Sequence, residues 1–85
     1  MRDLLEEAVR EYNRYRSPEV AARLIELRGS RFRVEFTGPF CRTCGFYDYF
    51  DDFRYMLLDL GVKSRVAGVE EVDEGAVVEF ELEQG

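Results

Sequence analysis

Apolar residues recur at two spacings along the chain, and the spacing predicts which segments are helices and which are strands. Near the N-terminus, Leu5, Ala8, Val9 and Tyr12 stand at positions i, i+3, i+4 and i+7. This spacing places them on one face of an α-helix. The pattern therefore predicts an amphipathic helix over residues 3–15.

Residues 17–29 show the start and stop signals of a second helix. Ser17 suits the N-cap and Pro18 the first helical position, whereas Gly29 suits a left-handed C-terminal cap. The apolar residues between these signals are Val20, Ala21, Leu24, Ile25 and Leu27. We expect this second helix to form a hairpin with the first.

The period of the apolar residues changes to two after Gly29. Phe32, Val34 and Phe36 alternate with charged residues, which predicts a strand over residues 31–37. The glycine and proline that follow end this strand, because proline cannot donate a hydrogen bond to a sheet.

A third helix is predicted ahead of Gly61, which suits its C-terminal cap. Either Thr43 or Asp48 suits its N-cap. The apolar stripe of this helix again steps by three and four, and it consists of Phe46, Phe50, Phe53, Leu57 and Leu60.

Alternation returns after the third helix and predicts two more strands, over residues 62–66 and 78–83, with a hairpin turn at residues 73–75. The outward positions of the last strand are acidic and those of the other two strands are basic: Glu79, Glu81 and Glu83 against Arg31, Arg33, Lys63 and Arg65. Opposite charges on neighbouring strands attract. We therefore place the C-terminal strand in the centre of the sheet.

Together these elements predict one α+β domain over residues 1–85. Its order is ααβαββ, and it forms a two-layer sandwich. The helices cover one face of a three-stranded mixed sheet, and the charged face is left to water.

Charge changes what this domain is expected to bind. The net charge is −6 for 85 residues, with +2 in residues 1–33 and −8 in residues 34–85. A protein that binds nucleic acid normally presents a basic face, so the acidic balance disfavours that class of partner. The charged residues are mainly Arg and Glu, a bias that resembles thermophile proteins.

The N-terminus is charged from the start, and no apolar run approaches the length of a membrane span. We therefore expect a cytoplasmic protein without a signal peptide or a membrane anchor.

The candidate chemistry centres on the Cys-x-x-Cys segment formed by Cys41 and Cys44. This spacing suits a redox dithiol, half of a metal site or a local disulfide. Thr43 as N-cap would place Cys44 in the first helical turn, which favours its thiolate, whereas the nearby Asp48 opposes it. We expect these effects to cancel, so that the two cysteines act mainly as a local clasp.

The order of strand, Cys-x-x-Cys and helix resembles the active-site turn of the thioredoxin-like family over about a dozen residues. The resemblance implies thiol-disulfide exchange by Cys41 and Cys44. Neither Pro18 nor Pro39 stands where that family has the cis-proline that faces its dithiol, and two helices are predicted ahead of the first strand.

A metal site is the other chemical alternative. A closed zinc site requires four ligands, and the chain has two cysteines and no histidine. Zinc would therefore need Cys41 and Cys44 from two chains, or Asp48 as a third ligand. Asp48, Asp51 and Asp52 share a helical face, an arrangement that suits oxygen ligands of Mg²⁺ or Ca²⁺. Acidic residues in the first turn of a helix also complement the positive end of its dipole. The sequence shows no nucleophile and base of a hydrolase, which disfavours enzymatic hydrolysis. We expect no bound cofactor, with zinc as the alternative.

The aromatic residues point to a different function, because exposed aromatic clusters mark recognition surfaces. Phe40, Tyr47, Tyr49 and Tyr55 fall beside the predicted apolar stripe. We expect a non-enzymatic interaction domain whose Cys-x-x-Cys turn and third helix form the working surface, with Phe40, Arg42, Tyr47 and Tyr49 as contact residues. The expected partner is another protein or a second copy of the chain, as in a homodimer.

Overall fold

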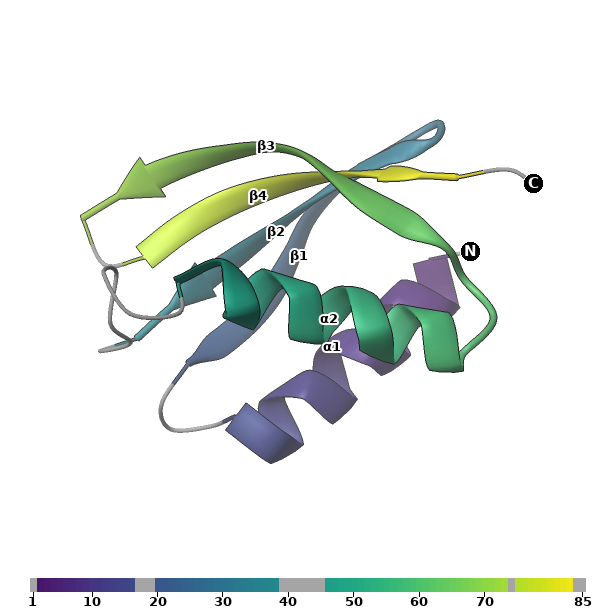
Figure 1. The fold of residues 1–85 in the computed structure, drawn as a ribbon, viewed down its shortest axis with the longest axis horizontal. Coiled ribbons are helices and arrows are strands. Elements are labelled where there is room, and N and C mark those ends of the chain that lie inside the picture. The colour runs from purple at the N-terminus through teal and green to yellow at the C-terminus, as the bar shows by residue number, and fades with distance from the viewer. Residues whose placement is uncertain (1, 17–19, 39–45, 74, 84–85) are drawn as a thin grey trace.

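The structure is a computed structural model that describes residues 2–16, 20–38, 46–73 and 75–83, with the side chains of residues 46 and 47 left out. The elements in chain order are α1 (Arg2–Arg16), β1 (Ala21–Arg28), β2 (Arg31–Thr37), α2 (Phe46–Asp59), β3 (Ser64–Val72) and β4 (Gly75–Leu82). Figure 1 shows both helices on the same side of the sheet. The predicted α+β class, with helices on one face, is confirmed.

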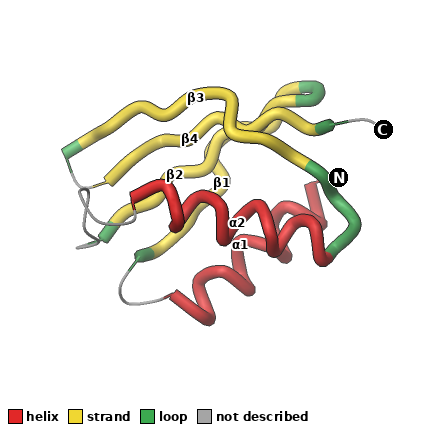
Figure 2. The backbone as a smooth tube through the Cα atoms, viewed as in Figure 1, coloured by secondary structure: helices red, strands yellow, loops and turns green. Residues whose placement is uncertain are grey.

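The four strands lie in the order β1-β2-β4-β3 (Figure 2), and every pair of neighbours is antiparallel. Strand β4 lies between β2 and β3, so the central position predicted for the C-terminal strand is confirmed. The prediction of a three-stranded mixed sheet is wrong, because the sheet has a fourth strand and all three pairings are antiparallel.

The fourth strand occupies the segment for which a second helix was predicted, so the order ααβαββ is wrong as well. Ala22, Leu24 and Leu27 of β1 contact the core, and the register of β1 shifts between Leu24 and Glu26. Ile25 is therefore the extra residue of a β-bulge. The bulge changes the spacing of the inward residues from two to three, and this irregular spacing imitates a helical stripe. Ser17 and Pro18 lie outside the described residues.

Gly29 belongs to a hairpin turn and not to a helix cap. Its φ angle is 59°, and the residues on either side of the turn, Arg28 and Arg31, are paired across β1 and β2. A positive φ at the first central position is typical of the tight turns that join antiparallel strands. The same glycine signal therefore serves either element.

The side chain of Asn13 binds the backbone of β1 to helix α1. Its amide nitrogen donates a hydrogen bond to the oxygen of Ala22 (3.0 Å), and the backbone N–H of Ala22 donates to the Asn13 Oδ1 (2.7 Å). The amide thus supplies the two hydrogen bonds that another strand would make. This contact covers part of an edge strand, where unpaired backbone groups would otherwise be open to other chains.

Helix α2 ends at Asp59, and Gly61 caps its C-terminus as the sequence predicts. The N–H of Gly61 donates to the oxygen of Leu58 (2.9 Å), and the N–H of Val62 donates to the oxygen of Leu57 (2.9 Å). Gly61 has a φ of 85°. This pair of bonds is the Schellman arrangement of a helix C-terminus, and it turns the chain toward β3.

The chain contains the unit α-β-β twice, and the second strands of the two units, β2 and β4, pair with each other at the middle of the sheet. The paired residues Val34 and Val78 lie at the centre of the β2–β4 contact. Both edge strands carry a bulge, at Ile25 in β1 and at Ala67 in β3. Bulges on edge strands oppose pairing with further strands. Both edges of the sheet are therefore protected against strand addition in the same way.

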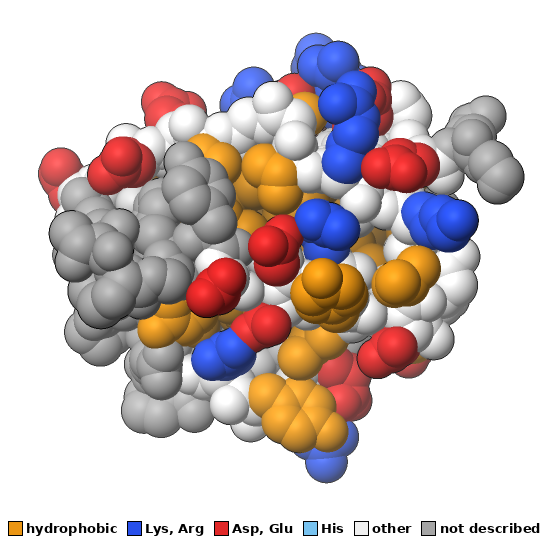
Figure 3. All heavy atoms as spheres, in the orientation of Figure 1, with side chains coloured by type: hydrophobic (Ala, Val, Ile, Leu, Met, Phe, Trp, Pro, Cys, Tyr) orange, Lys and Arg blue, Asp and Glu red, His pale blue; other side chains and the backbone are white. Residues whose placement is uncertain are grey.

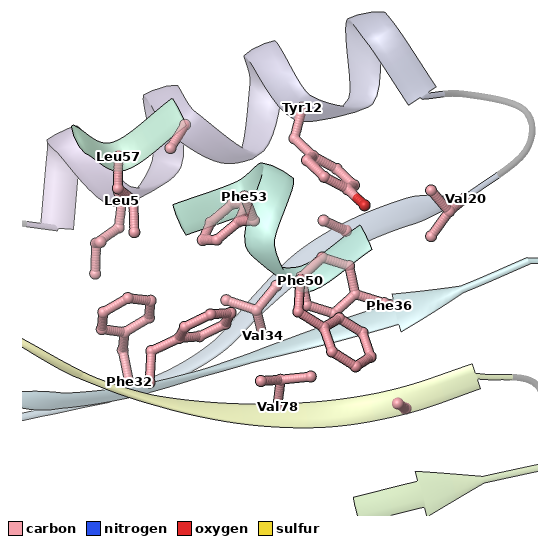
Figure 4. Packing of buried hydrophobic residues seen from close by; sticks show 14 of the residues in the cluster. Leu5, Tyr12, Val20, Phe32, Val34, Phe36, Phe50, Phe53, Leu57 and Val78 are labelled. Atoms are coloured by element: carbon pink, nitrogen blue, oxygen red, sulfur yellow. The ribbon is translucent and has the colours of Figure 1, made fainter. Parts of the chain in front are cut away.

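The core lies between the sheet and the helices and is rich in aromatic rings (Figure 4). Phe36 of β2 is its centre, with ring centroids 5.4 Å from Tyr12 of α1, 5.0 Å from Phe50 of α2 and 6.4 Å from Phe80 of β4. Aromatic pairs at these separations attract beyond their burial. The predicted stripe of α1 is confirmed, since Leu5 and Tyr12 are fully buried.

Replacement of Asn13 tests the contact between α1 and β1. Asn13→Ala leaves both backbone groups of Ala22 without this partner, and we expect it to lower the free energy of unfolding by about 1–3 kcal/mol. Arg14→Ala, on the exposed side of the same helix, should change it by less than about 0.5 kcal/mol. Urea denaturation of both variants measures the difference, and equal effects would contradict the role of the amide.

Candidate interaction surface

The predicted turn lies largely outside the described part of the chain. Phe40, Cys41, Arg42 and Cys44 belong to the residues that are not described, and only the backbone of Tyr47 is placed, in α2. Clasp, thiol exchange and a shared zinc site therefore stay predictions for this segment. Helix α2 is the part of the predicted working surface that the structure describes.

Tyr49 is half-buried and joins the two helices. The guanidinium of Arg16 in α1 lies 5.2 Å from the centre of its ring, a cation–π contact. The hydroxyl of Tyr12 donates a hydrogen bond to the backbone oxygen of Tyr49 (2.9 Å). Part of the Tyr49 side chain packs against the core, so the ring contributes to folding as well as to the surface.

The acidic face of α2 is matched by arginines. Asp51 accepts a hydrogen bond from Arg54 (2.9 Å), and Asp52 forms an ion pair with Arg16 of α1. Asp48 is exposed. No group of three or more His, Cys, Asp or Glu residues within the described ranges is arranged to hold a metal ion. Asp51 is therefore matched by an arginine within α2, whereas Asp52 joins α2 to α1.

Exposed apolar side chains gather on the helices. Tyr15 is 75% exposed, Tyr55 58% and Leu58 47%, and Figure 3 shows hydrophobic side chains among charged ones over the helical layer. The exposure of Tyr55 follows from the sequence, because it falls off the apolar stripe. Leu58 also falls off the apolar stripe, because it directly follows the stripe residue Leu57. Its exposure was not predicted. Tyr15 was missed because it stands one turn after the buried Tyr12.

A groove of about 290 Å³ separates the outer surfaces of α1 and α2. The residues that line it are Glu7, Ala8, Glu11, Tyr15, Met56, Asp59 and Leu60. Its floor is apolar and its acidic members carry negative charge. The groove therefore suits a partner that combines an apolar group with a positive one.

A second pocket, of about 220 Å³, lies on the other side of α2, toward β3. The residues that line it are Arg54, Tyr55, Leu58, Lys63, Ser64 and Glu83. Two of these residues are basic and one is acidic. The two sides of α2 therefore differ in the sign of their charge.

The sheet face opposite the helices is covered by alternating charges. The ion pairs are Arg23–Glu35, Glu26–Arg33, Arg33–Glu79, Arg31–Glu79, Arg31–Glu81 and Arg65–Glu81. They connect all four strands. Glu79 pairs with Arg31 and Arg33, and Glu81 pairs with Arg31 and Arg65, as the charge argument used to order the strands predicts. Glu83 and Lys63, which were predicted in the same rows, lie outside β4 and β3. We call the eight residues of these ion pairs the sheet charge network.

Glu81 shows the electrostatic effect of this network. A hydrogen bond from Arg65, reinforced by the charges of Arg65 and Arg31, holds the pKa of Glu81 below its ordinary value of 4.5. A carboxyl group whose pKa is lowered by folding stabilises the fold while it is ionised. This contribution is lost as the pH falls through the lowered pKa.

Comparison of the chain with family models, with curated proteins and with solved structures finds no match. Among the described residues, no helix is both long and apolar enough to cross a membrane.

Acid titration of Glu81→Gln tests the sheet charge network. The variant should be less stable than the wild type at about pH 7. The difference should shrink as the pH falls from the ordinary value of 4.5 through the lowered pKa of folded Glu81, because the ionised form that the arginines stabilise is then lost. Glu70→Gln, at an exposed position of β3, serves as the control. A stability difference that is the same at about pH 7 and about pH 3 would contradict the network's role. Urea denaturation at each pH measures it.

Alkylation of the reduced protein tests the chemistry of Cys41 and Cys44. If the two cysteines act as a clasp, their thiols should react with the alkylating reagent at half-maximal rate at about pH 8 to 9, the range of ordinary cysteines. Half-maximal reactivity below about pH 6 would instead assign the pair to thiol-disulfide exchange. Mass spectrometry of each cysteine-containing peptide separates the two sites.

Proposed function

We propose that the protein is a small, non-enzymatic cytoplasmic interaction domain whose helical layer binds its partner. The observation that carries this proposal is the exposure of Tyr15, Tyr55 and Leu58 on the two helices. Tyr55 and Leu58 lie one helical turn apart on α2, and Tyr15 lies on α1. Large exposed apolar groups are typical of binding surfaces, and aromatic residues supply much of the energy at their centres.

The opposite face of the molecule supports this choice by contrast. Arginines and glutamates of the sheet charge network neutralise one another, as in the series Glu26–Arg33–Glu79–Arg31. A partner that docks there would have to separate ion pairs and remove them from water, which costs free energy. The helical layer also carries ion pairs, but it exposes large apolar side chains as well, at Tyr15, Tyr55 and Leu58.

A second copy of the chain is the partner that the charges favour. The α1 side of α2 carries Glu7, Glu11 and Asp59, and the β3 side carries Arg54 and Lys63. In a symmetric dimer each copy uses the same surface, so residue i contacts j and j contacts i. A two-fold axis along α2 would bring the acidic side of one copy to the basic side of the other. Charge complementarity of this kind fixes the orientation of partners.

The Cys-x-x-Cys turn adjoins this surface in the chain, because Cys41 and Cys44 directly precede α2. In this proposal the pair acts as a clasp that ties the beginning of the helix. Phe40, Arg42 and Tyr47 would extend the contact from the same end, with Tyr49 beside them. The surface would then run along the whole helix from its N-terminus to Leu58.

Sedimentation of the purified protein tests the proposal. We expect the mass to rise with concentration for the wild type. Tyr55→Ser combined with Leu58→Ser should weaken the association by about tenfold or more, since truncation of a central contact residue commonly costs over 1 kcal/mol.

Ile25→Ser is the matched control, because Ile25 is 44% exposed but lies on β1, away from the helical layer. It should leave the association constant unchanged. A wild type that stays monomeric at every concentration, or a control that weakens association as much as the double variant, would refute self-association through the helices.

A further inference from the structure

Two residues that line the pocket between α2 and β3 each carry a buried hydrogen-bond donor with no partner in the described part of the chain. Ser64 is only 8% exposed, and its Oγ bonds to no atom of the described chain. The Nε of Arg54 is also buried and unbonded. Both residues line the same pocket. Native proteins rarely leave such groups unsatisfied, and a bound ion or ligand is a common reason when they do.

Contacts around the pocket hold one of these donors in place. The Nη1 of Arg54 donates to Asp51 at 2.9 Å, and the guanidinium lies 5.7 Å from the centre of the Tyr55 ring. These two contacts restrict the side chain while its Nε stays unbonded. The donor edge of the guanidinium is therefore preorganised, and an acceptor that meets it does not have to order the side chain first.

The charge of the pocket selects the kind of acceptor. Arg54 and Lys63 bring two positive charges, Glu83 brings one negative charge, and Asp51 already pairs with the Nη1 of Arg54, so Lys63 is the basic group without an ion pair among the described residues. An anion is favoured over a neutral acceptor, because hydrogen bonds to charged groups are the stronger ones. Glu83 repels a doubly charged phosphate more than a singly charged carboxylate. Tyr55 and Leu58 add apolar walls to the pocket, which suit an apolar body attached to the charged group.

We propose that this pocket is a binding site for a carboxylate on an apolar body, held by Arg54, Lys63 and Ser64. The inference rests on the proposed function, because Tyr55 and Leu58 belong both to the pocket and to the helical surface. The carboxylate comes either from a free small molecule or from an acidic side chain of the second copy, such as Glu11. The chemistry that recognises it is the same in both cases.

Benzoate is the probe, and benzamide is its uncharged control. Titration followed by two-dimensional NMR should show benzoate shifting the signals of residues around Ser64, with benzamide and inorganic phosphate each binding at least about tenfold more weakly. Equal binding of benzoate and benzamide would overturn the carboxylate assignment. Absence of any shift with benzoate would mean that water alone satisfies the two donors, and it would overturn the site.

Ser64→Ala gives a readout that a purely structural role would not produce. Without ligand, the variant should unfold at the same temperature as the wild type or higher, because it removes an unsatisfied buried hydroxyl. It should also lose about tenfold or more in benzoate affinity, and Lys63→Gln should make benzoate binding less sensitive to salt. Ser30→Ala and Arg10→Gln, at exposed positions, are the matched controls. A Ser64→Ala variant that binds benzoate like the wild type would overturn the proposal.

Sedimentation with and without benzoate separates the two sources of the carboxylate. If a second copy supplies it, benzoate and Glu11→Gln should both lower the association constant. If a free small molecule supplies it, benzoate should bind without changing the mass. Association that is unaffected by Ser64→Ala, together with no benzoate binding, would overturn the carboxylate site and leave the proposed helical surface standing.

Discussion

The contacts of the Phe36 ring are the interaction on which both layers depend. Strand β2 places this ring where it meets Tyr12 of α1, Phe50 and Phe53 of α2, and Phe80 of β4. A domain of this size buries only about 60% of the surface of its unfolded chain. It therefore has a single hydrophobic core, in which this one ring contacts the sheet and both helices. This cluster therefore positions both the helical layer and the sheet relative to each other.

Periodicity predicted the elements whose inward residues are evenly spaced, and it failed where a bulge breaks the spacing. Helices α1 and α2 and strands β2 and β4 were recognised from their stripes. Strand β1 was not, because the extra residue Ile25 separates Leu24 from Leu27 by three positions. Besides its pairing with β2, strand β1 is held by two hydrogen bonds with Asn13 in another element. Its partner lies nine positions away, and no local pattern indicates it.

The candidate surface was predictable only in part, for a related reason. The exposure of Tyr55 follows from its place beside a stripe on its own helix. The pocket beyond it joins Arg54 of α2 with Ser64 of β3, and only the turn of the chain at Gly61 brings these two donors together. In the sequence, Ser64 reads as an ordinary inward residue of a strand. Its unpaired hydroxyl becomes visible only when every neighbour is known.

The sheet charge network makes one whole face of the molecule a zwitterion. Its members are the four arginines Arg23, Arg31, Arg33 and Arg65 and the four glutamates Glu26, Glu35, Glu79 and Glu81. Their charges sum to zero, so the net charge of −6 resides elsewhere on the chain. The fields of closely spaced opposite charges cancel within about one Debye length, roughly 8 Å in physiological salt. At separations beyond that length these eight charges largely cancel, so the network adds little to any long-range attraction between this face and a charged macromolecule.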